Sequence, residues 1–489
     1  MTDPFGAKID KDHVLWPLFC PKPTIHILFY TDDADVLSST ADFGSTTLRD
    51  WIISANSFYA DFHIDIVNRF GGSPWVSGQL RATQPLTAAL LAQYDQVWFF
   101  GVSQCNLASQ PENELSNAEV AALKNWMTTG GVLMTGDHAN PNPDPANGLD
   151  PLLNLGRALG HRVPRAGQLR KWEGLPSSDT GVTPPGEPMG PRMNHNTQQP
   201  DPPLVLDSLG PQSDAIPQPL YLKKYPLWSF HPWFERRERP HPLFCGRSGV
   251  IEVFPDHMHE GMLSVPAAGA PDWPPGGIGP EVVASGRDTR TGRIWPVVAA
   301  YDGNPGGVGR IVADSTWHHY FNVNLRGFAA GSAARQAISD YYVNLAVWLS
   351  PKVKRDAMRC AVLWWLYRQA AVREVFLQPS WVIGGEAFDV LGRTSGRCTL
   401  VDLIFPWDKY VIVENRPHWP WPPEEWLLGG ILHEYQRAAA AGEPIESRQL
   451  LQRRGIERAV KDQIEAFEYG AREAAGLAGR LDEVLGRDA

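Results

Sequence analysis

Strand and helix signals alternate over the first 160 residues, and this alternation constrains the fold more than any other feature of the chain. Short apolar runs typical of strands occur at 24–31, 62–70, 96–101 and 131–136. Helical periodicity lies between them at 46–58, with Ser45 as a candidate cap, and at 115–127, which opens with the capping box Ser116 and Glu119. A β-α-β-α-β order requires right-handed crossovers, so we expect an α/β fold with an open, mostly parallel sheet flanked by helices.

The rest of the chain divides into an irregular insertion, further strand signals and a helical end. Residues 161–245 are rich in proline and glycine and show little periodicity, which is typical of a long insertion that is either a functional lid or disordered. Strand signals return in three later segments, 249–254, 293–301 and 309–314. The pattern then becomes helical, so we predict an α/β domain over residues 1–350 and a mainly α-helical domain over residues 351–489.

Charge and cysteine content exclude some classes of function. The 489 residues carry a formal net charge of −10, which argues against nucleic acid or an anionic membrane as the main partner. The five cysteines form no C-x-x-C pair and indicate neither a disulfide framework nor a zinc ribbon. No secretory signal is visible, and no apolar run approaches about 18 residues. We therefore expect a cytoplasmic protein that acts on a small molecule.

Polar side chains follow five of the predicted strands at their carboxyl ends. These side chains, in chain order, are Asp32 and Asp33, Gln104 and Cys105, Asp137 and His138, then His257, His259 and Glu260, and finally Asp314, His318 and His319. In an open parallel sheet, ligands bind outside the carboxyl ends of the strands. We therefore expect these side chains to line one shared cleft.

Several of these residues also have a structural interpretation. His257 and His259 would point to one side of an extended segment, a spacing that suits a metal, although turn histidines also bond to loop carbonyls. His318 and His319 are adjacent, so they cannot both face the cleft from a regular strand, and we expect one of them to be structural. Cys105 is a candidate nucleophile or a small buried side chain.

The stretch "YDQVWFFG…LSNAEVAALKNWMTTGGVLMTGDHAN" resembles the class I glutamine amidotransferase-like fold, nearest to its ThuA-like branch. The resemblance extends over about residues 20–350 and implies a flavodoxin-like sheet. In true amidotransferases the turn after this strand carries a nucleophilic cysteine, whereas Gly136, Asp137 and His138 occupy that place here. Glutamine hydrolysis is therefore not expected. ThuA-like relatives are associated with sugar metabolism, and some hold a metal ion at this cleft, which implies a similar site.

The first functional hypothesis is a metal-dependent hydrolase of a small polar or carbohydrate-like substrate. The predicted ligands of zinc or another divalent transition metal are His138, His257, His259 and Asp314. The predicted catalytic groups are Glu260, Asp137 and His318. The predicted substrate contacts are Asp32, Asp33, Gln104, Cys105 and His319.

Two other hypotheses remain open. A metal-free enzyme would use His138 and Glu260 for acid–base chemistry, or Cys105 as the nucleophile. A non-catalytic binding or assembly protein would use the α/β domain as a scaffold. In that case the C-terminal helices, with Ile464, Phe467 and Tyr469 among many charges, would bind a protein partner or a second copy.

Overall fold

The computed structural model describes residues 20–31, 37–42, 44–55, 57–69, 84–100, 115–135, 160, 162–169, 217–228, 236–255, 263, 265–266, 272–273, 279–287, 294–394, 396–404, 424–440 and 448–485. The chain forms two compact units. Unit 1 comprises Met1–Pro21, Tyr225–Arg239 and Arg359–Ala489, and unit 2 comprises Lys22–Lys224 and Pro240–Met358. The boundary between the units falls within helix α9 (Lys352–Tyr367).

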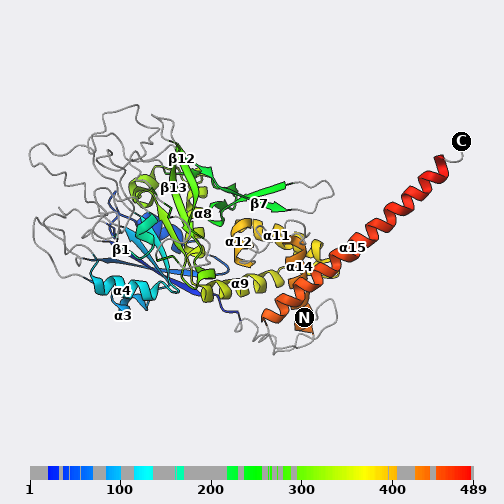
Figure 1. The fold of residues 1–489 in the computed structure, drawn as a ribbon, viewed down its shortest axis with the longest axis horizontal. Coiled ribbons are helices and arrows are strands. Elements are labelled where there is room, and N and C mark those ends of the chain that lie inside the picture. Colours follow the sequence, from blue (N-terminus) through cyan, green and yellow to red (C-terminus); the bar gives the residue numbers. More distant parts are fainter. Residues whose placement is uncertain are drawn as a thin grey trace, which may run out of the picture. The chain divides into compact units, whose positions relative to one another are not determined.

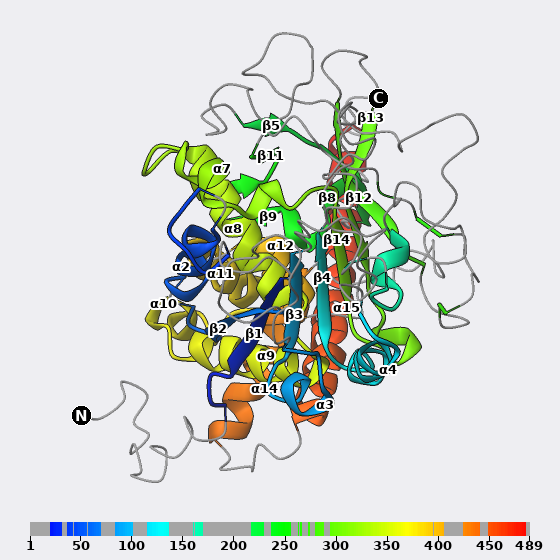
Figure 2. The same cartoon turned by 90° about the vertical axis from the view of Figure 1, so that its left-hand side faces the viewer.

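Unit 2 is built around an eight-stranded sheet, whose parallel strands are seen side by side in Figure 2. In spatial order the strands are β2 (Asp61–Asn68), β1 (Thr24–Thr31), β3 (Gln96–Phe100), β4 (Gly131–Thr135), β14 (Ile311–Asp314), β13 (Ile294–Tyr301), β12 (Glu281–Arg287) and β6 (Tyr221–Leu222). The first five strands are parallel to one another, and the last three are added antiparallel. The protein is therefore of the mixed α/β class, as the alternating signals predicted.

Helices cover both faces of the parallel strands, so the central strands are apolar along their whole length. On one face, Val97 and Phe99 of β3 pack with Leu123 of helix α4 (Asn117–Trp126). On the other face, the Gln96 side chain donates to a backbone carbonyl of helix α8 (Ala333–Trp348). Continuous apolar strands of this kind are typical of parallel sheets that are buried on both sides.

Helix α4 begins as the local sequence predicts. The Ser116 hydroxyl accepts a hydrogen bond from the backbone N–H of Glu119 at 3.3 Å, and the Glu119 carboxylate accepts one from the backbone N–H of Ser116 at 2.8 Å. Both donors would otherwise lack a partner at the helix start. The predicted capping box is confirmed.

Helix α2 (Thr46–Ile53) begins differently from the prediction. The hydroxyl of Ser45 makes no capping bond and instead donates to the carbonyl of Leu37 at 3.0 Å. The side chain of Asn322 accepts from the backbone N–H of Thr47 at 2.7 Å and takes the capping role. A residue more than 270 positions away in the sequence therefore caps this helix.

The predicted strand at 249–254 does not join the eight-stranded sheet. It is interrupted, and its two pieces are β10 (Gly249–Val250) and β11 (Val253–Phe254). Each piece forms a small antiparallel pair, β10 with β9 (Cys245–Gly246) and β11 with β5 (Gln218–Pro219). Their partners lie within the proline-rich insertion, so the expectation of another strand end in the parallel set was wrong for this segment. Residues 170–216 of the insertion lie outside the described residues.

Unit 1 is mainly helical in its described part. It contains the end of α9 and, in chain order, α10 (Ala370–Glu374), α11 (Ser380–Gly392), α12 (Arg397–Ile404), α14 (Glu424–Ala440) and α15 (Arg448–Leu485). Helix α14 packs between α11 and α15, and α15 runs on past the end of α14 (Figure 1). None of the helices in the described ranges is both long and apolar enough to cross a membrane.

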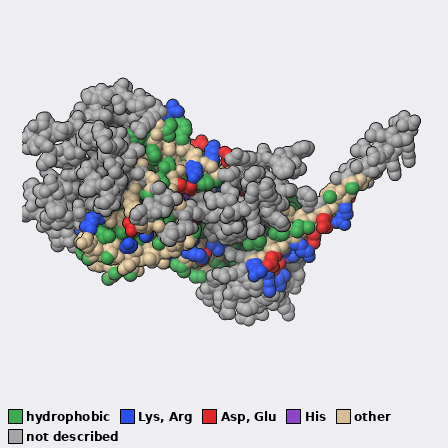
Figure 3. All heavy atoms as spheres, in the orientation of Figure 1, with side chains coloured by type: hydrophobic (Ala, Val, Ile, Leu, Met, Phe, Trp, Pro, Cys, Tyr) green, Lys and Arg blue, Asp and Glu red, His purple; other side chains and the backbone are tan. Residues whose placement is uncertain are grey.

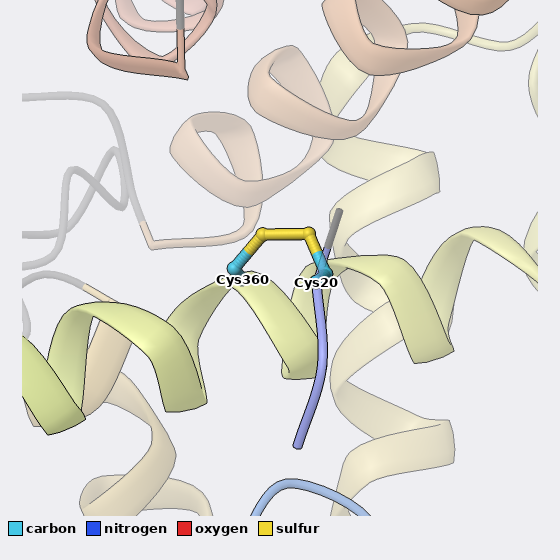
Figure 4. Close-up of a disulfide and its surroundings, with 2 residues drawn as sticks. All are labelled: Cys20 and Cys360. Atoms are coloured by element: carbon cyan, nitrogen blue, oxygen red, sulfur yellow. A yellow bond between two sulfur atoms is a disulfide. The ribbon is translucent and has the colours of Figure 1, made fainter. Parts of the chain in front are cut away.

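A disulfide joins Cys20 to Cys360 of helix α9 within unit 1 (Figure 4). Both cysteines are buried, and they lie 340 positions apart in the sequence. The cysteine spacing did not predict this bond, because a single long-range pair leaves no local pattern. The bond fastens the segment before β1 to α9.

Candidate functional site

A buried group of hydrogen-bonded side chains lies at the carboxyl edge of the sheet, the edge at which the parallel strands end. Asp314 is the last residue of β14, and a 3₁₀ helix, η7 (His318–Tyr320), follows shortly after it. Oxygen Oδ1 of Asp314 lies 2.8 Å from Nδ1 of His319, and Oδ2 accepts from the Tyr320 hydroxyl at 2.9 Å. All three side chains are at most 1% exposed.

The turn after β14 places these side chains by its own hydrogen bonds. Oδ1 of Asp314 also accepts from the backbone N–H of Thr316 at 3.2 Å, an arrangement that aspartate commonly forms at turns. The turn reverses the chain, so that His319 faces Asp314 five residues earlier. The Tyr342 hydroxyl of helix α8 donates to the backbone carbonyl of His319 and fixes the turn from the opposite side.

Ends of other strands converge on the same place. Phe254, the last residue of β11, packs against the His319 ring with centroids 5.0 Å apart. Phe100, the last residue of β3, packs against Tyr320 with centroids 5.6 Å apart. Strand β4 neighbours β14 in parallel register, so its last residue, Thr135, ends at the same edge as Asp314.

The surroundings fix the protonation of the hydroxyl groups around Asp314. Burial, together with the negative charge of Asp314 and neighbouring tyrosines, raises the pKa of Tyr320 well above its ordinary value. Burial likewise raises the pKa of Tyr341 and Tyr342. Tyr320 therefore remains a neutral donor to Asp314. With the Asp314 carboxylate as the acceptor, a neutral His319 carries its ring proton on Nδ1 and its lone pair on Nε2.

The two adjacent histidines have different surroundings. The His318 ring lies against Trp317 and Phe321, with centroid distances of 4.7 and 6.1 Å. His319 is the histidine that contacts Asp314. The sequence suggested His318 as the catalytic residue and His319 as a substrate contact, whereas the geometry gives His319 the contact typical of a functional imidazole.

The other predicted site residues lie outside the described residues. They are Asp32, Asp33, Gln104, Cys105, Asp137, His138, His257, His259 and Glu260. Within the part of the chain that the structure describes, no group of three or more His, Cys, Asp or Glu side chains is placed to hold a metal ion. The described residues thus contribute one oriented imidazole, His319, and the carboxylate that orients it.

A buried ion pair that the sequence did not indicate lies at the same edge. Arg69, directly after β2, donates to both carboxylate oxygens of Glu119 at 2.5 and 3.0 Å, and both side chains are about 95% buried. Glu119 also accepts from the backbone N–H groups of Leu86 and Ser116. The capping-box glutamate therefore binds an arginine as well, and this second role has no local sequence signal.

A buried arginine with no acidic hydrogen-bond partner among the described residues lies at the opposite, amino edge of the sheet. Arg165 is 5% exposed and has a left-handed backbone conformation with φ of 60°. Among the described residues it makes one long hydrogen bond, to the carbonyl of Met127 at 3.4 Å, and its Nε has no acceptor. Burial lowers the pKa of Arg165, against the opposing effect of Tyr301 and Asp272.

Comparisons with known proteins do not place the chain in a family. No family model matches the chain, and no curated protein matches it. A solved structure described as the "mmIFT52 N-terminal domain" is similar to 66% of this chain and 96% of its own, with 12% identity and a TM-score of 0.34. A similarity at this level carries no argument about function.

Proposed function

We propose that the carboxyl edge at β4 and β14 is the active site of a metal-dependent hydrolase that acts on a small polar or carbohydrate-like substrate. The observation that carries the proposal is the 2.8 Å contact between Asp314 Oδ1 and His319 Nδ1. A histidine that binds a metal commonly donates its other ring N–H to a carboxylate, and this contact gives His319 that arrangement.

The geometry changes one role that the sequence suggested. Because Asp314 accepts from three donors, we assign it to positioning His319 and not to direct contact with the metal. His319 would then join His138, His257 and His259 as a nitrogen ligand. A nitrogen-rich set suits zinc or another divalent transition metal, which when bound lowers the pKa of a coordinated water toward neutrality.

Chain length supports this set of ligands. Asp137 and His138 follow Thr135 by two and three residues, and His257 follows Phe254 by three. An extended chain covers at most about 3.6 Å per residue, so these side chains begin within roughly 7–11 Å of the two anchoring residues. Both anchors lie at the edge where His319 is held.

The remaining predicted residues have roles that follow from the same arrangement. Glu260 and Asp137 would exchange protons with water and with the leaving group. The order β2-β1-β3-β4-β14 has the pattern of a flavodoxin-like sheet, and we include a flavodoxin- or glutamine amidotransferase-like fold in the proposal. Its order reverses between β1 and β3. Substrate contacts would therefore come from Asp32, Asp33, Gln104 and Cys105, which follow these strands.

The proposal is tested by elemental analysis of the purified protein after dialysis against zinc. We expect near-stoichiometric metal in the unchanged protein, and its loss in His319→Gln and in the double variant His257→Ala/His259→Ala. His63→Gln is the matched control, because His63 lies on β2 with an exposed ring. Hydrolysis of chromogenic esters and glycosides should follow metal content. An unchanged protein that binds no metal would overturn the proposal.

The same contact also supports the metal-free alternative. An aspartate that orients a histidine is the arrangement that activates a nucleophile in acyl transfer, and Cys105 is the candidate nucleophile. If the protein is active without metal, Cys105→Ser should abolish turnover while Cys245→Ser, at a buried position in β9, should not. Full activity of Cys105→Ser would exclude Cys105 as the nucleophile. Acid–base chemistry by His138 and Glu260 would then be the remaining metal-free mechanism.

We retain a cytoplasmic location as part of the proposal, and the Cys20–Cys360 disulfide is the observation against it. Structural disulfides are rare in a reducing cytoplasm. Alkylation of whole cells before lysis, followed by peptide mass spectrometry, tests this point. A linked Cys20–Cys360 peptide pair in most of the native protein would contradict a cytoplasmic location.

A further inference from the structure

Helix α15 is divided into a packed part and an exposed part. In the packed part, the backbone of Gly455 lies so close to α14 that an added Cβ would be 2.5 Å from the Cα of Ile431. Ala459, one turn later, is fully buried. From Ile464 to Gly476 every described side chain is exposed, including Ile464 at 54% and Tyr469 at 63%. Charged side chains are visible along this helix in Figure 3.

The C-terminal part of α15 carries a seven-residue repeat that begins at the half-buried Val460 and continues through the exposed part. From Val460 onward, apolar residues follow one another at alternating intervals of four and three. They are Val460, Ile464, Phe467, Ala471, Ala474, Ala478, Leu481 and Leu485. A helical backbone puts these positions on one face, and a repeat sustained over more than three heptads is typical of a two-stranded coiled coil. In a coiled coil, a second helix packs against such a face.

We propose that a second copy of this chain covers this face, with the two α15 helices antiparallel. The register that aligns all eight positions puts Ala471 opposite Ala474 of the second copy, at the centre of the pair. Position 467 is then paired with position 478 of the second copy, a phenylalanine with an alanine, so that the volumes at this level are complementary. The alanines at the centre allow the two helix axes to approach closely. The proposal goes beyond the proposed enzymatic function and is independent of it.

Charge favours the antiparallel orientation over the parallel one. Lys461 and Asp482 occupy the same flanking position of the heptad, and the antiparallel register places them opposite each other. The two-fold symmetry of such a pair forms this contact twice. In a parallel pair, Lys461 would instead be opposite Ile456 and Asp482 opposite Leu477, with no opposite-charge contact. The flanking charges therefore specify orientation.

The mass of the full chain in solution tests the proposal. Sedimentation equilibrium from about 0.1 to 50 μM should give about twice the monomer mass of 54.2 kDa at the upper concentrations. Ala471→Asp places two like charges at the centre, so it should weaken dimerisation about 100-fold or more. Ala466→Asp is the matched control, because Ala466 is exposed on α15 outside the repeat, and it should leave the dimer intact.

A charge exchange tests the orientation. Lys461→Asp and Asp482→Lys should each weaken the dimer, and the double variant should restore it, because the antiparallel pairs are then reversed. Far-UV circular dichroism of each variant checks that α15 is retained. A monomeric unchanged chain, for example because another segment of the same chain covers the face, would overturn the proposal. A dimer that survives Ala471→Asp would also overturn it, and failure of the double variant to recover would overturn the antiparallel register.

Discussion

The two edges of the parallel sheet carry the same kind of ion pair but differ in the other buried polar groups that lie at each edge. At the carboxyl edge Arg69 binds Glu119, and at the amino edge Arg310 donates to Asp302 at 2.7 Å. Both pairs are buried. The carboxyl edge also carries the Asp314–His319–Tyr320 group, and the amino edge also carries Arg165, for which the described residues offer no acidic hydrogen-bond partner.

This difference separates two uses of buried charge. At the carboxyl edge, Asp314 holds an imidazole in one tautomer, an arrangement that can bind a ligand or transfer a proton. At the amino edge, the Asp302–Arg310 pair has a structural role, because Arg310 connects the start of β14 to the end of α8. Arg310 also donates to the carbonyl of Trp348 and stacks on the Trp348 ring at 4.5 Å. The chemistry that we propose is therefore expected at only one of the edges.

The largest expected effect comes from breaking the ion pair at the carboxyl edge. Glu119→Ala leaves the Arg69 guanidinium buried without a counter-charge, so we expect a loss of about 3–5 kcal/mol in the free energy of unfolding. Urea denaturation measures this loss. Glu465→Ala, at an exposed position of α15, is the control and should change stability by less than about 0.5 kcal/mol. A loss below about 1 kcal/mol for Glu119→Ala would contradict the structure of this pair.

The same pair predicts a dependence on pH. Burial alone would raise the pKa of Glu119, but the hydrogen bonds and charge of Arg69 and the backbone N–H donors outweigh it and lower that pKa below 4.5. A carboxyl group whose pKa is lower in the folded state stabilises the fold above its unfolded pKa. The stabilisation is lost as the pH falls through the lower, folded value. Glu119→Gln should therefore flatten the loss of stability below about pH 4.5.

A smaller effect is expected from the group at Asp314. Asp314→Asn removes the charge that three donors share, so we expect a loss of about 1–3 kcal/mol and a change in the His319 tautomer. Nitrogen chemical shifts of the imidazole report the tautomer. Tyr320→Phe, the matched variant, removes one donor to Asp314 and should lower the free energy of unfolding by about 1 kcal/mol. It should leave the ring proton of His319 on Nδ1. Identical imidazole shifts in Asp314→Asn and the unchanged protein would contradict the positioning role.

At the amino edge, removing a buried charge is expected to have the opposite sign. Arg165→Met replaces a buried guanidinium, which has no acidic partner in the described part of the chain, by an apolar side chain of similar length, so stability should stay the same or rise by about 1 kcal/mol. Arg310→Met, at the same edge, should instead lose about 3–5 kcal/mol, because Asp302 keeps its charge. Thermal and urea unfolding measure both. A loss above about 2 kcal/mol in Arg165→Met would show that Arg165 has a partner.

Local signals in the sequence predicted the local parts of this structure. The strands of the parallel set and the capping box of α4 depend on residues a few positions apart, and both are confirmed. The cap of α2 by Asn322, the Cys20–Cys360 disulfide and the pairing of β11 with residues 218–219 were not predicted. Each of these depends on partners far apart in the sequence, which periodicity and spacing cannot show.

The candidate site shows the same division. The position of Asp314, His318 and His319 directly after a predicted strand led us to expect Asp314 and one of the two histidines at the carboxyl edge. The choice between His318 and His319 depends on the turn after β14, in which Thr316 bonds to Asp314. Tyr320 was not among the predicted site residues, although it directly follows His319 in the sequence. A tyrosine next to a histidine, six residues after an aspartate that opens a turn, is therefore worth testing as a donor.

The smallest expected effect is a shift in the pKa of Tyr94, a partly buried tyrosine that can be compared with the completely buried Tyr320. Tyr94, in the connection that enters β3, donates to Asp65 at 2.8 Å. Burial, this hydrogen bond and the charge of Asp65 raise the pKa of Tyr94 to about 12. Because the folded pKa lies above the unfolded value of 10.0, the contribution to stability is complete below pH 10 and is lost as the pH rises through about 12.

Ultraviolet titration of the phenolate measures this shift, with Tyr94→Phe identifying the transition that belongs to Tyr94. Asp65→Asn should move that transition toward the ordinary value, because it removes the negative charge. Tyr320, which is completely buried beside Asp314, should instead ionise only when the protein unfolds. Superimposable curves for the unchanged protein and Tyr94→Phe above about pH 11 would contradict the hydrogen bond to Asp65. The titration therefore compares a hydroxyl that keeps access to water with one that the carboxyl edge encloses.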